Sequence, residues 1–415
     1  MSPGAEGMGS GTSRRTRCLR SVYSEHRGGI NWLSLSPDGD HLLTCSEDGT
    51  ARLWETKGLQ CCALLQGHDS YVTHGHLEND VAYTCSADHT VRKWDMATGG
   101  CMHVFRGHTS IVNRVLVASG CLFSGSYDRT ARCWNPDSGR QLQEFRGHRN
   151  GVLALAHFSA QDLVPDYALS GGQGGDFLVT GSTDCTVKLW LVLNGHCCHT
   201  LRGHQGAILC MLLDVPGRAL FTGSRDHTVR CWDLATGEQT RVLQDHQGSI
   251  ICLEFVNRHL YSGSTDRTVK CWMVASGECV RTYKSHRHTV STLQFYEGIL
   301  FTGSGDSCAR AFDTTSGILR RVFKGHKFII NCLQVHNQML YTVSHDCTMR
   351  VWDVRGLYKC DQGEDSESRW KGSFGIGLSR VRRNRVGCLG LSHRPTTATS
   401  TRNDQEGRED TLELD

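Results

Sequence analysis

The chain has 415 residues with 45 Lys and Arg against 42 Asp and Glu, so its formal net charge is only +3. Such a balanced charge gives no reason to expect a nucleic-acid-binding surface. Hydrophobic residues make up 38% of the chain and occur in strand-sized runs, so no membrane-spanning helix is expected.

Residues 1–16 are predicted to be a disordered tail, because Gly, Ser and Arg dominate there without the apolar run of a secretory signal. Residues 8–13 (MGSGTS) match the consensus for N-terminal myristoylation, with Gly9 as the acceptor, if translation starts at Met8 rather than at Met1. Arginines at positions 14, 15, 17 and 20 would supply the second signal that stable anchoring needs. A peripheral membrane anchor and an ordinary solvated tail are therefore both open.

From residue 17 to residue 357 the sequence repeats itself. Eight histidines follow one another at spacings of 42, 40, 40, 56, 42, 40 and 40 residues. Each is followed by Ser-x-Asp, and an aromatic residue lies six positions after the aspartate. The sets are His26, Ser46, Asp48, Trp54; His68, Ser86, Asp88, Trp94; His108, Ser126, Asp128, Trp134; His148, Ser182, Asp184, Trp190; His204, Ser224, Asp226, Trp232; His246, Ser264, Asp266, Trp272; His286, Ser304, Asp306, Phe312; and His326, Ser344, Asp346, Trp352. The units lie near 17–56, 57–96, 97–136, 137–192, 193–234, 235–274, 275–314 and 315–354. This self-similarity predicts a repeat architecture.

The sixth unit shows the expected strands of one repeat. Ile250 to Phe255, Leu260 to Ser264, Thr268 to Val274 and Cys279 to Tyr283 are four short runs separated by turn residues. Apolar residues occur on both faces of these strands, which indicates a sheet covered by a neighbour on each side.

These motifs resemble those of the WD-repeat family over about residues 18 to 356. The resemblance implies an all-β propeller of four-stranded antiparallel blades. Eight repeats predict eight blades, with seven as the alternative if one unit is degenerate. The eighth unit holds only three strands, so Arg17 to Tyr23 is expected to close the last blade and complete one domain over residues 17–357.

The resemblance also implies a monomeric, non-catalytic scaffold that binds other proteins or peptides in the cytoplasm. The 21 cysteines are interpreted as small buried side chains in a reducing compartment. The 56-residue spacing places an insertion at residues 157–177, which the family geometry assigns to the face opposite the histidines. Residues 358–415 lack the repeat and are predicted to be a second disordered tail.

In the family, the aspartate of each set holds the histidine, which reaches the serine, which accepts the indole N–H. Out of context the set also resembles the Ser-His-Asp triad of hydrolases, but a fully paired polar chain inside a blade serves structure, so no catalytic residue is assigned. Blade seven has Phe312 in place of tryptophan and Cys308 where other blades have threonine. It is therefore expected to lack one hydrogen bond and to be the softest blade.

Partners are expected on the face that carries the histidines. The candidate contact residues there are Tyr71, Ile111, Tyr127, Leu153, Leu209, Arg225 and Ile251. Aromatic, aliphatic and arginine side chains are typical of interface hot spots. The alternative is that several of these residues begin an inner strand and are partly buried. Because Arg225 is the only arginine at the positions considered, recognition of phosphorylated peptides by clustered arginines is not expected.

Two further motifs were weighed. Residues 352–355 resemble the WDxR box that attaches some propellers to the adaptor of cullin-RING ubiquitin ligases, with Asp353 and Arg355 as the contact. A ligase substrate receptor is thus the alternative function, and a membrane-associated adaptor a second one. Residues 196–199 (HCCH) form a dense metal-type cluster, but neighbouring residues on a strand point to opposite faces. No metal site and no cofactor are therefore predicted.

Overall fold

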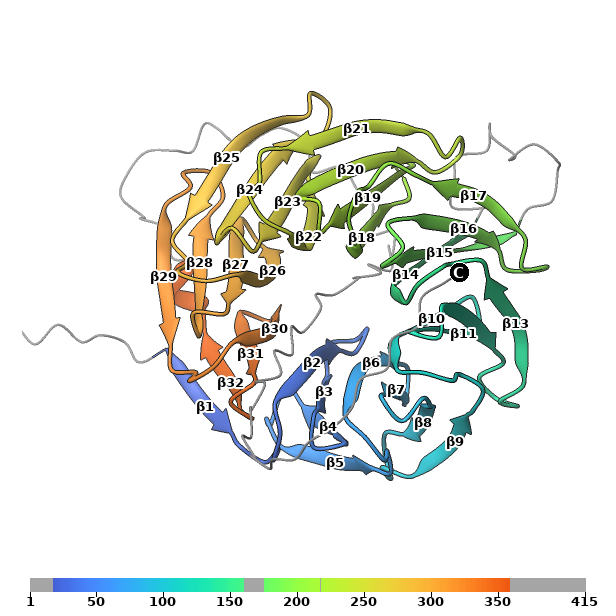
Figure 1. Cartoon of the computed structure of the whole chain (residues 1–415). Helices are drawn as coiled ribbons and strands as arrows, with labels where there is room; N and C mark the ends of the chain where they lie inside the picture. Colours follow the sequence, from blue (N-terminus) through green and yellow to red (C-terminus); the bar gives the residue numbers. More distant parts are fainter. Residues whose placement is uncertain (1–17, 160–174, 217, 359–415) are drawn as a thin grey trace, which may run out of the picture.

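The computed structural model describes residues 18–159, 175–216 and 218–358. These residues form eight four-stranded antiparallel sheets arranged in a ring, and each sheet is one blade (Figure 1). The expected eight-bladed propeller is confirmed, and the seven-bladed alternative is wrong. Within the described residues the one helix is the 3-10 turn η2 (Arg355–Leu357), and none is long and apolar enough to cross a membrane.

The four strands of each blade run in order from the centre of the ring to its rim. The first four blades contain β2 (Ile30–Leu35), β3 (His41–Ser46), β4 (Thr50–Glu55) and β5 (Cys61–Gln66); β6 (Val72–Glu78), β7 (Val81–Ser86), β8 (Val91–Asp95) and β9 (Cys101–Phe105); β10 (Val112–Ala118), β11 (Cys121–Ser126), β12 (Thr130–Trp134) and β13 (Gln141–Arg146); and β14 (Val152–Ser159), β15 (Asp176–Ser182), β16 (Val187–Leu191) and β17 (Cys197–Leu201). Blades five to seven contain β18 (Ile208–Asp214), β19 (Ala219–Ser224), β20 (Thr228–Asp233) and β21 (Gln239–Gln244); β22 (Ile250–Val256), β23 (His259–Ser264), β24 (Thr268–Met273) and β25 (Glu278–Lys284); and β26 (Val290–Tyr296), β27 (Ile299–Ser304), β28 (Cys308–Asp313) and β29 (Leu319–Lys324). Blade eight contains β30 (Ile330–His336), β31 (Met339–Ser344), β32 (Met349–Asp353) and β1 (Leu19–Tyr23).

The N-terminal strand β1 closes the ring as expected. It forms the rim of blade eight and pairs with β32, where Tyr23 lies opposite Met349 and Leu19 lies opposite Trp352. The backbone N–H of Asp353 adds a hydrogen bond of 2.7 Å to the carbonyl of Cys18. This pairing covers an edge of β32 that would otherwise be open to other strands.

The two faces of the ring differ in what they carry. The top face holds the loops with the repeat histidines and the turns with the aspartates, and the bottom face holds the other turns. Because β1 runs from beside Asp353 up to beside Met349, the chain enters the ring on the bottom face. The last described residue, Tyr358, packs edge-on against Tyr296 in the bottom turn of blade seven, with ring centroids 6.1 Å apart. Both ends of the described chain therefore lie on the bottom.

The predicted tails at 1–16 and 358–415 lie outside the described residues, apart from Tyr358 itself. The central part of the predicted insertion, residues 160–174, is also outside them. The strands that flank it, β14 and β15, meet at the bottom of blade four, where Ser159 pairs with Asp176.

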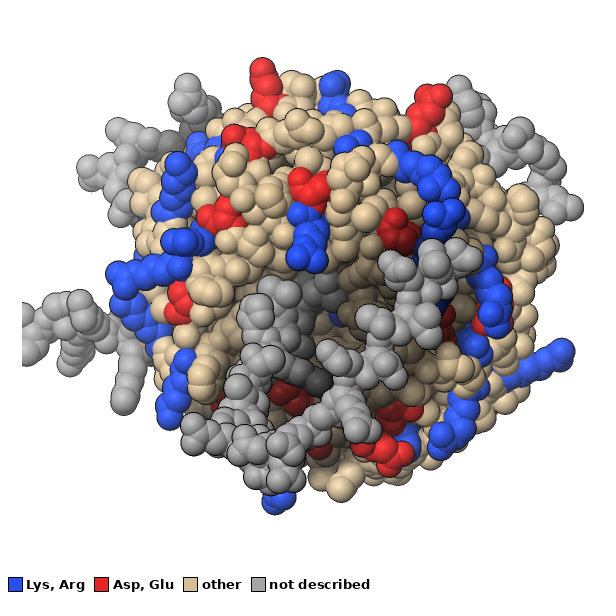
Figure 2. Space-filling view, viewed as in Figure 1, with Lys and Arg blue, Asp and Glu red and all other residues tan. Residues whose placement is uncertain are grey.

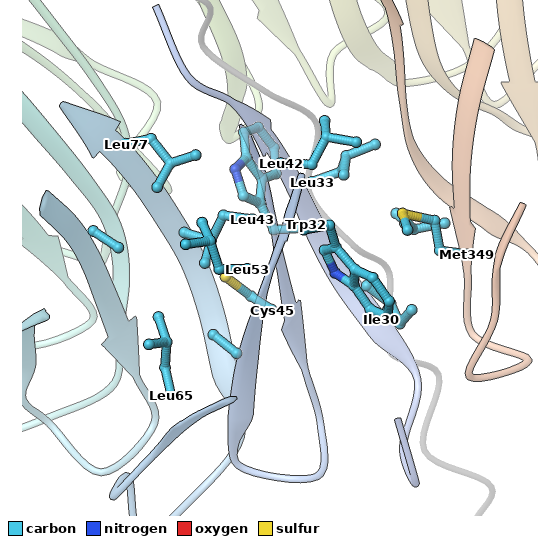
Figure 3. Close-up of a cluster of buried hydrophobic side chains, with 14 of the residues drawn as sticks. Ile30, Trp32, Leu33, Leu42, Leu43, Cys45, Leu53, Leu65, Leu77 and Met349 are labelled. Atoms are coloured by element: carbon cyan, nitrogen blue, oxygen red, sulfur yellow. The ribbon is translucent and has the colours of Figure 1, made fainter. Parts of the chain in front are cut away.

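The hydrophobic core lies between the blades. Figure 3 shows blade one in the middle of such a cluster, with Leu77 of blade two on one side and Met349 of blade eight on the other. Leu43 and Cys45 in β3 are completely buried. Because each blade is covered on both faces, its strands are apolar on both faces as well.

Every inner strand carries a β-bulge at the same place. In blade one the pairing register shifts between Ile30 and Trp32, which leaves Asn31 without a partner on β3. The same shift occurs in the other seven blades. The bulged residue is the fifth after the repeat histidine, and a bulge re-aims its side chain.

Candidate functional site

A buried chain of hydrogen bonds lies beneath the top face in each blade. In blade three, the His108 imidazole contacts Asp128 Oδ2 at 2.6 Å through Nδ1 and Ser124 Oγ at 2.7 Å through Nε2. The Trp134 indole N–H donates to the same Ser124 oxygen at 2.8 Å. Because a carboxylate only accepts, Nδ1 carries the proton, and Nε2 accepts the hydroxyl proton of Ser124. Seven blades contain all three contacts.

The hydroxyl in this chain is not the serine that the repeat pattern suggested. It belongs to the residue two positions earlier on the second strand: Thr44, Thr84, Ser124, Thr180, Thr222, Ser262, Thr302 and Thr342. The predicted serines hold the top turns together instead. Ser126, for example, accepts the backbone N–H of Asp128 at 3.1 Å and donates to the carbonyl of Ser110 at 3.1 Å. Residues two apart on a strand share one face, so spacing alone did not separate the two hydroxyls.

The charge states of the chain follow from burial and hydrogen bonding. Burial raises the pKa of Asp128, but hydrogen bonds from His108 and Thr130 outweigh it and hold that pKa well below its ordinary value. Burial lowers the pKa of His108, which favours the neutral imidazole. The Ser124 side chain is completely buried and already accepts the indole N–H, so no substrate can reach it as a nucleophile. The network therefore stabilises the turn, with about 1 kcal/mol for each net hydrogen bond.

Blade seven builds the same site from different side chains. Cys308 and Phe312 supply neither the hydroxyl nor the indole found elsewhere, and Arg310 turns inward to fill the space. Its Nη1 lies 2.8 Å from Asp306 Oδ2 and also contacts His286 Nδ1. His286 Nδ1 also lies 3.2 Å from Asp306 Oδ2, and His286 Nε2 lies 2.7 Å from Thr302 Oγ1, so the histidine keeps both of the contacts that it makes in the other blades. Thr302 Oγ1 therefore lacks the indole donor found in blade three, and Arg310 adds a donor at the aspartate end of the chain instead.

The predicted contact residues separate into exposed and buried groups. Tyr71 and Tyr127 are 38% and 44% exposed on the top face. Burial, and to a smaller extent the Tyr71 phenol of the neighbouring blade, raise the pKa of Tyr127. The Tyr127 ring also reaches over blade four, because a Cβ atom added at Gly151 would lie 2.5 Å from its Cδ1. Tyr71, Tyr127 and the partly buried Ile111 between them form what we call the tyrosine patch.

Two of the predicted contact residues are wrong. Leu153 is 3% exposed and Ile251 is 1% exposed, so neither can meet a partner. Both are bulged residues of inner strands, and the bulge turns their side chains into the junction with the next blade. Leu209, at the same position of blade five, is partly buried, whereas Arg225 is exposed as predicted.

At the equivalent bulge positions of five other blades, polar side chains form hydrogen bonds with the next blade. They hydrogen-bond the carbonyl that begins its inner strand: Asn31 to Val72, Thr73 to Val112, Asn113 to Val152, Ser291 to Ile330 and Asn331 to Ile30. Blades four, five and six have aliphatic residues there and make no such bond. The fifth-residue set is therefore a structural feature of the ring rather than a contact surface.

One exposed aromatic residue on the top face was not among the predicted contact residues. Phe328 in blade eight is 58% exposed and packs edge-on against His345, whose Nδ1 lies 3.6 Å from Glu47 in blade one. Phe328 is the second residue after its histidine, a position that was not considered. A comparison of that position across the repeats would have singled it out as the one aromatic residue among small and polar ones.

A family model described as "WD domain, G-beta repeat" matches the chain eight times, at residues 16–55, 59–95, 99–135, 139–190, 195–233, 237–273, 277–313 and 317–353. The chain belongs to the WD-repeat family. Among curated relatives it is 70% identical to human WD repeat-containing protein 86 over 210 residues, which are 51% of this chain and 54% of that protein. The match thus spans about half the length of the relative. A crystal structure of the computationally designed Ika8 protein matches with a TM-score of 0.70 and 27% identity, covering 79% of this chain and 97% of that one.

The WDxR motif of this WD-repeat propeller lies on the bottom of blade eight. Arg355 Nε contacts the two carboxylate oxygens of Asp353 at 3.0 and 3.1 Å, and Arg20 Nη2 lies 3.3 Å from the same carboxylate. Hydrogen bonds from Arg355 hold the pKa of Asp353 well below its ordinary value, although some burial opposes them. Arg355 is exposed, but its guanidinium is already paired.

The remaining predicted sites have simple outcomes. The residues 196–199 lead into the outer strand β17, where Cys198 is exposed and Cys197 is partly buried, as the alternation of a strand requires. Among the described residues no three His, Cys, Asp or Glu side chains are placed to hold a metal ion. Gly9, the predicted lipidation site, lies outside the described residues.

Proposed function

We propose that this WD-repeat propeller is a scaffold that docks other proteins or peptides on its top face, at the tyrosine patch. The propeller fold of the WD-repeat family is typical of protein-interaction scaffolds. The observation that carries the proposal is the pair of exposed tyrosines, Tyr71 and Tyr127, on the top loops of the neighbouring blades two and three. Rigid aromatic side chains of this kind dominate the energy of many interfaces.

The layout of the ring supports the same face. Both ends of the described chain lie on the bottom face, and so do the ends of β14 and β15 that flank residues 160–174, so the described loops of the top face are short. All described cysteines are free thiols, which supports placing the scaffold in the reducing cytoplasm.

Proximity labelling in cells tests the proposal with the full chain. The test variant is Tyr71→Asp/Tyr127→Asp, and the matched control is Leu64→Asp/Leu142→Asp, which places the same charges on exposed leucines of the outer strands. Both variants are first compared with the parent by circular dichroism and thermal unfolding. We expect a set of partners to disappear only with the tyrosine variant. Equal partner lists for all three proteins would show that the tyrosine patch is not the docking site.

A second candidate function, substrate receptor of a cullin-RING ligase, rests on the exposed Asp353–Arg355 pair at the bottom of blade eight. An adaptor would have to take the place of Asp353 as the partner of Arg355. Pull-down of a ligase adaptor that is lost with Arg355→Ala but kept with Arg20→Ala would support this function. Failure to recover any adaptor with the parent protein would remove it.

A further inference from the structure

We infer that the partner of the top face presents an acidic segment, rich in Asp and Glu, to the propeller. This inference rests on the proposed docking function of the top face and names the chemistry of its partner. It starts from basic side chains on the top loops that have no acidic counterpart within the described chain.

The top loops expose seven basic side chains. They are Arg27, Arg129, Arg149, Arg225, Arg267, Arg287 and Lys327, which come from seven of the eight blades. Among the described residues, none of the seven makes a side-chain hydrogen bond or an ion pair with a carboxylate. Arg225 is the one arginine at the residue before each aspartate and at the third and fifth residues after each histidine, whereas the other six lie at different loop positions.

The backbone conformation fixes the positions from which these side chains project. Arg149 directly follows a repeat histidine, and its N–H donates to Asp184 Oδ2 at 2.8 Å. Arg129 and Arg267 directly follow repeat aspartates, and their φ angles of 72° and 73° lie in the left-handed region that closes the turn. The basic groups therefore project from rigid loops, which lowers the entropy lost when a partner binds.

The nearby carboxylates are already engaged. The eight repeat aspartates bond their histidines, Glu25 pairs with Arg52 at 2.6 Å, and Asp245 pairs with Lys270. Glu47 lies beside His345, which leaves Asp69 as the one exposed carboxylate at these loop positions without a basic partner. Elsewhere in the described chain, many basic side chains have acidic neighbours, such as Lys93 with Asp137. The top face therefore carries an excess of positive charge that the ring itself does not neutralise.

Part of this charge lies beside the tyrosine patch, on the side of blades three and four. Arg129 is two residues after Tyr127, and Arg149 is two residues before Gly151, over which the Tyr127 ring lies. In the view of Figure 2, Lys and Arg side chains are likewise spread over many blades, with many along the left and right sides of the ring. A partner segment with an apolar side chain between acidic ones would place the apolar side chain on the tyrosine patch and the acidic side chains near Arg129 and Arg149.

Fluorescence anisotropy with the full chain tests the inference. The probes are a fluorescein-labelled short peptide of Glu, Gly and Leu and a matched peptide with Gln in place of Glu. We expect the Glu peptide to bind and Arg129→Glu/Arg149→Glu to weaken it by about tenfold or more, because charge complementarity at an interface contributes at this scale. The control Arg140→Glu/Arg258→Glu makes the same change in net charge on exposed bottom residues, and should change binding by less than about twofold at physiological salt because of screening.

Several outcomes would overturn the inference. They are the absence of binding, equal binding of the Gln peptide, or equal weakening by the two reversals. Tighter binding by a full-length Glu409→Gln/Asp410→Asn/Glu413→Gln variant would mean that the acidic residues of this chain itself occupy the face, and would exclude an external partner as the first occupant. If Arg129→Glu/Arg149→Glu keeps the cellular partners that Tyr71→Asp/Tyr127→Asp loses, the top face docks partners but does not recognise their charge. If neither variant loses cellular partners, the proposed docking function of the top face is wrong.

Discussion

Blades three and seven form the same turn at the top of the ring but fill it with different side chains. In blade three, Thr130 donates to Asp128 Oδ1 at 2.6 Å, and the Arg132 guanidinium contacts Gln141 and Glu144 instead of the aspartate, 6.0 Å from the centre of the Trp134 ring. In blade seven the threonine and the indole are both replaced, and the arginine at the matching position, Arg310, turns inward onto the aspartate. The prediction that blade seven would simply lack a hydrogen bond was therefore incomplete.

The difference shows what the buried site requires. The histidine and the aspartate stay in place in both blades, but in blade seven an arginine replaces the threonine hydroxyl as the second donor to the aspartate. The repeat therefore tolerates changes in the donors as long as each buried polar atom of the chain keeps a partner. Whether blade seven is the least stable blade depends on how far Arg310 compensates for the missing hydroxyl and indole. The free energies of unfolding of point variants can measure this compensation.

The largest expected effect comes from removing the aspartate. Asp306→Ala should lower the free energy of unfolding by about 3–5 kcal/mol, because it leaves the buried Arg310 without its counter-charge. Asp128→Ala should cost less, about 2–3 kcal/mol, since it strands neutral donors only. Urea unfolding of both variants followed by circular dichroism measures the two losses. Equal losses would mean that Arg310 is not held by Asp306.

A second effect concerns the two arginines. Arg310→Met should cost about 2 kcal/mol, because Asp306 and His286 both lose a buried, charge-assisted hydrogen bond. The matched variant Arg132→Met removes contacts to the partly exposed Gln141 and Glu144, to which water can bind instead, and should cost less, about 1 kcal/mol. Differential scanning calorimetry compares the two melting temperatures with that of the parent. A larger loss for Arg132→Met would contradict the inward role of Arg310.

Acid should weaken the ring, and blade seven should contribute to this. Burial lowers the pKa of His108 and of His286, and Arg310 lowers that of His286 further. A histidine with a lowered pKa takes up its proton more readily when unfolded, so stability is complete above the ordinary value of 6.5 and falls as the pH decreases from there toward the folded pKa. Each such histidine adds at most about 1.4 kcal/mol per pH unit.

Urea midpoints measured from pH 8 down to about 5 should therefore decrease, within the window set by this linkage. Arg310→Met should flatten part of the decrease, because it removes one of the causes that lower the pKa of His286. An identical pH profile for this variant and the parent would show that Arg310 does not influence the protonation of His286.

Much of the fold was predictable because the same residues recur at the same spacing in each repeat. The spacing of His68, Asp88 and Trp94 located the blade, its turns and its rim, and the spare strand before His26 located the closure. The roles of side chains two residues apart were less accessible, as Thr84 and Ser86 illustrate, because both lie on one face of β7. Leu153 was misplaced because a bulge alters the direction of one residue without leaving a mark in the sequence. The inward turn of Arg310 depends on space left by two other residues, which no single position reveals.

The smallest expected effect would convert blade seven into the common form. Cys308→Thr and Phe312→Trp together restore the hydroxyl and the indole, so Arg310 should move outward over the new ring, as Arg132 does in blade three. Each change alone should stabilise little, because Arg310 still occupies the site. In a double-mutant cycle the pair should therefore exceed the sum of the single changes by about 0.5–1 kcal/mol, which is the coupling expected between residues that share one site. Strict additivity would mean that the two positions act independently, and that the inward position of Arg310 arises from Arg310 itself rather than from the space left around it.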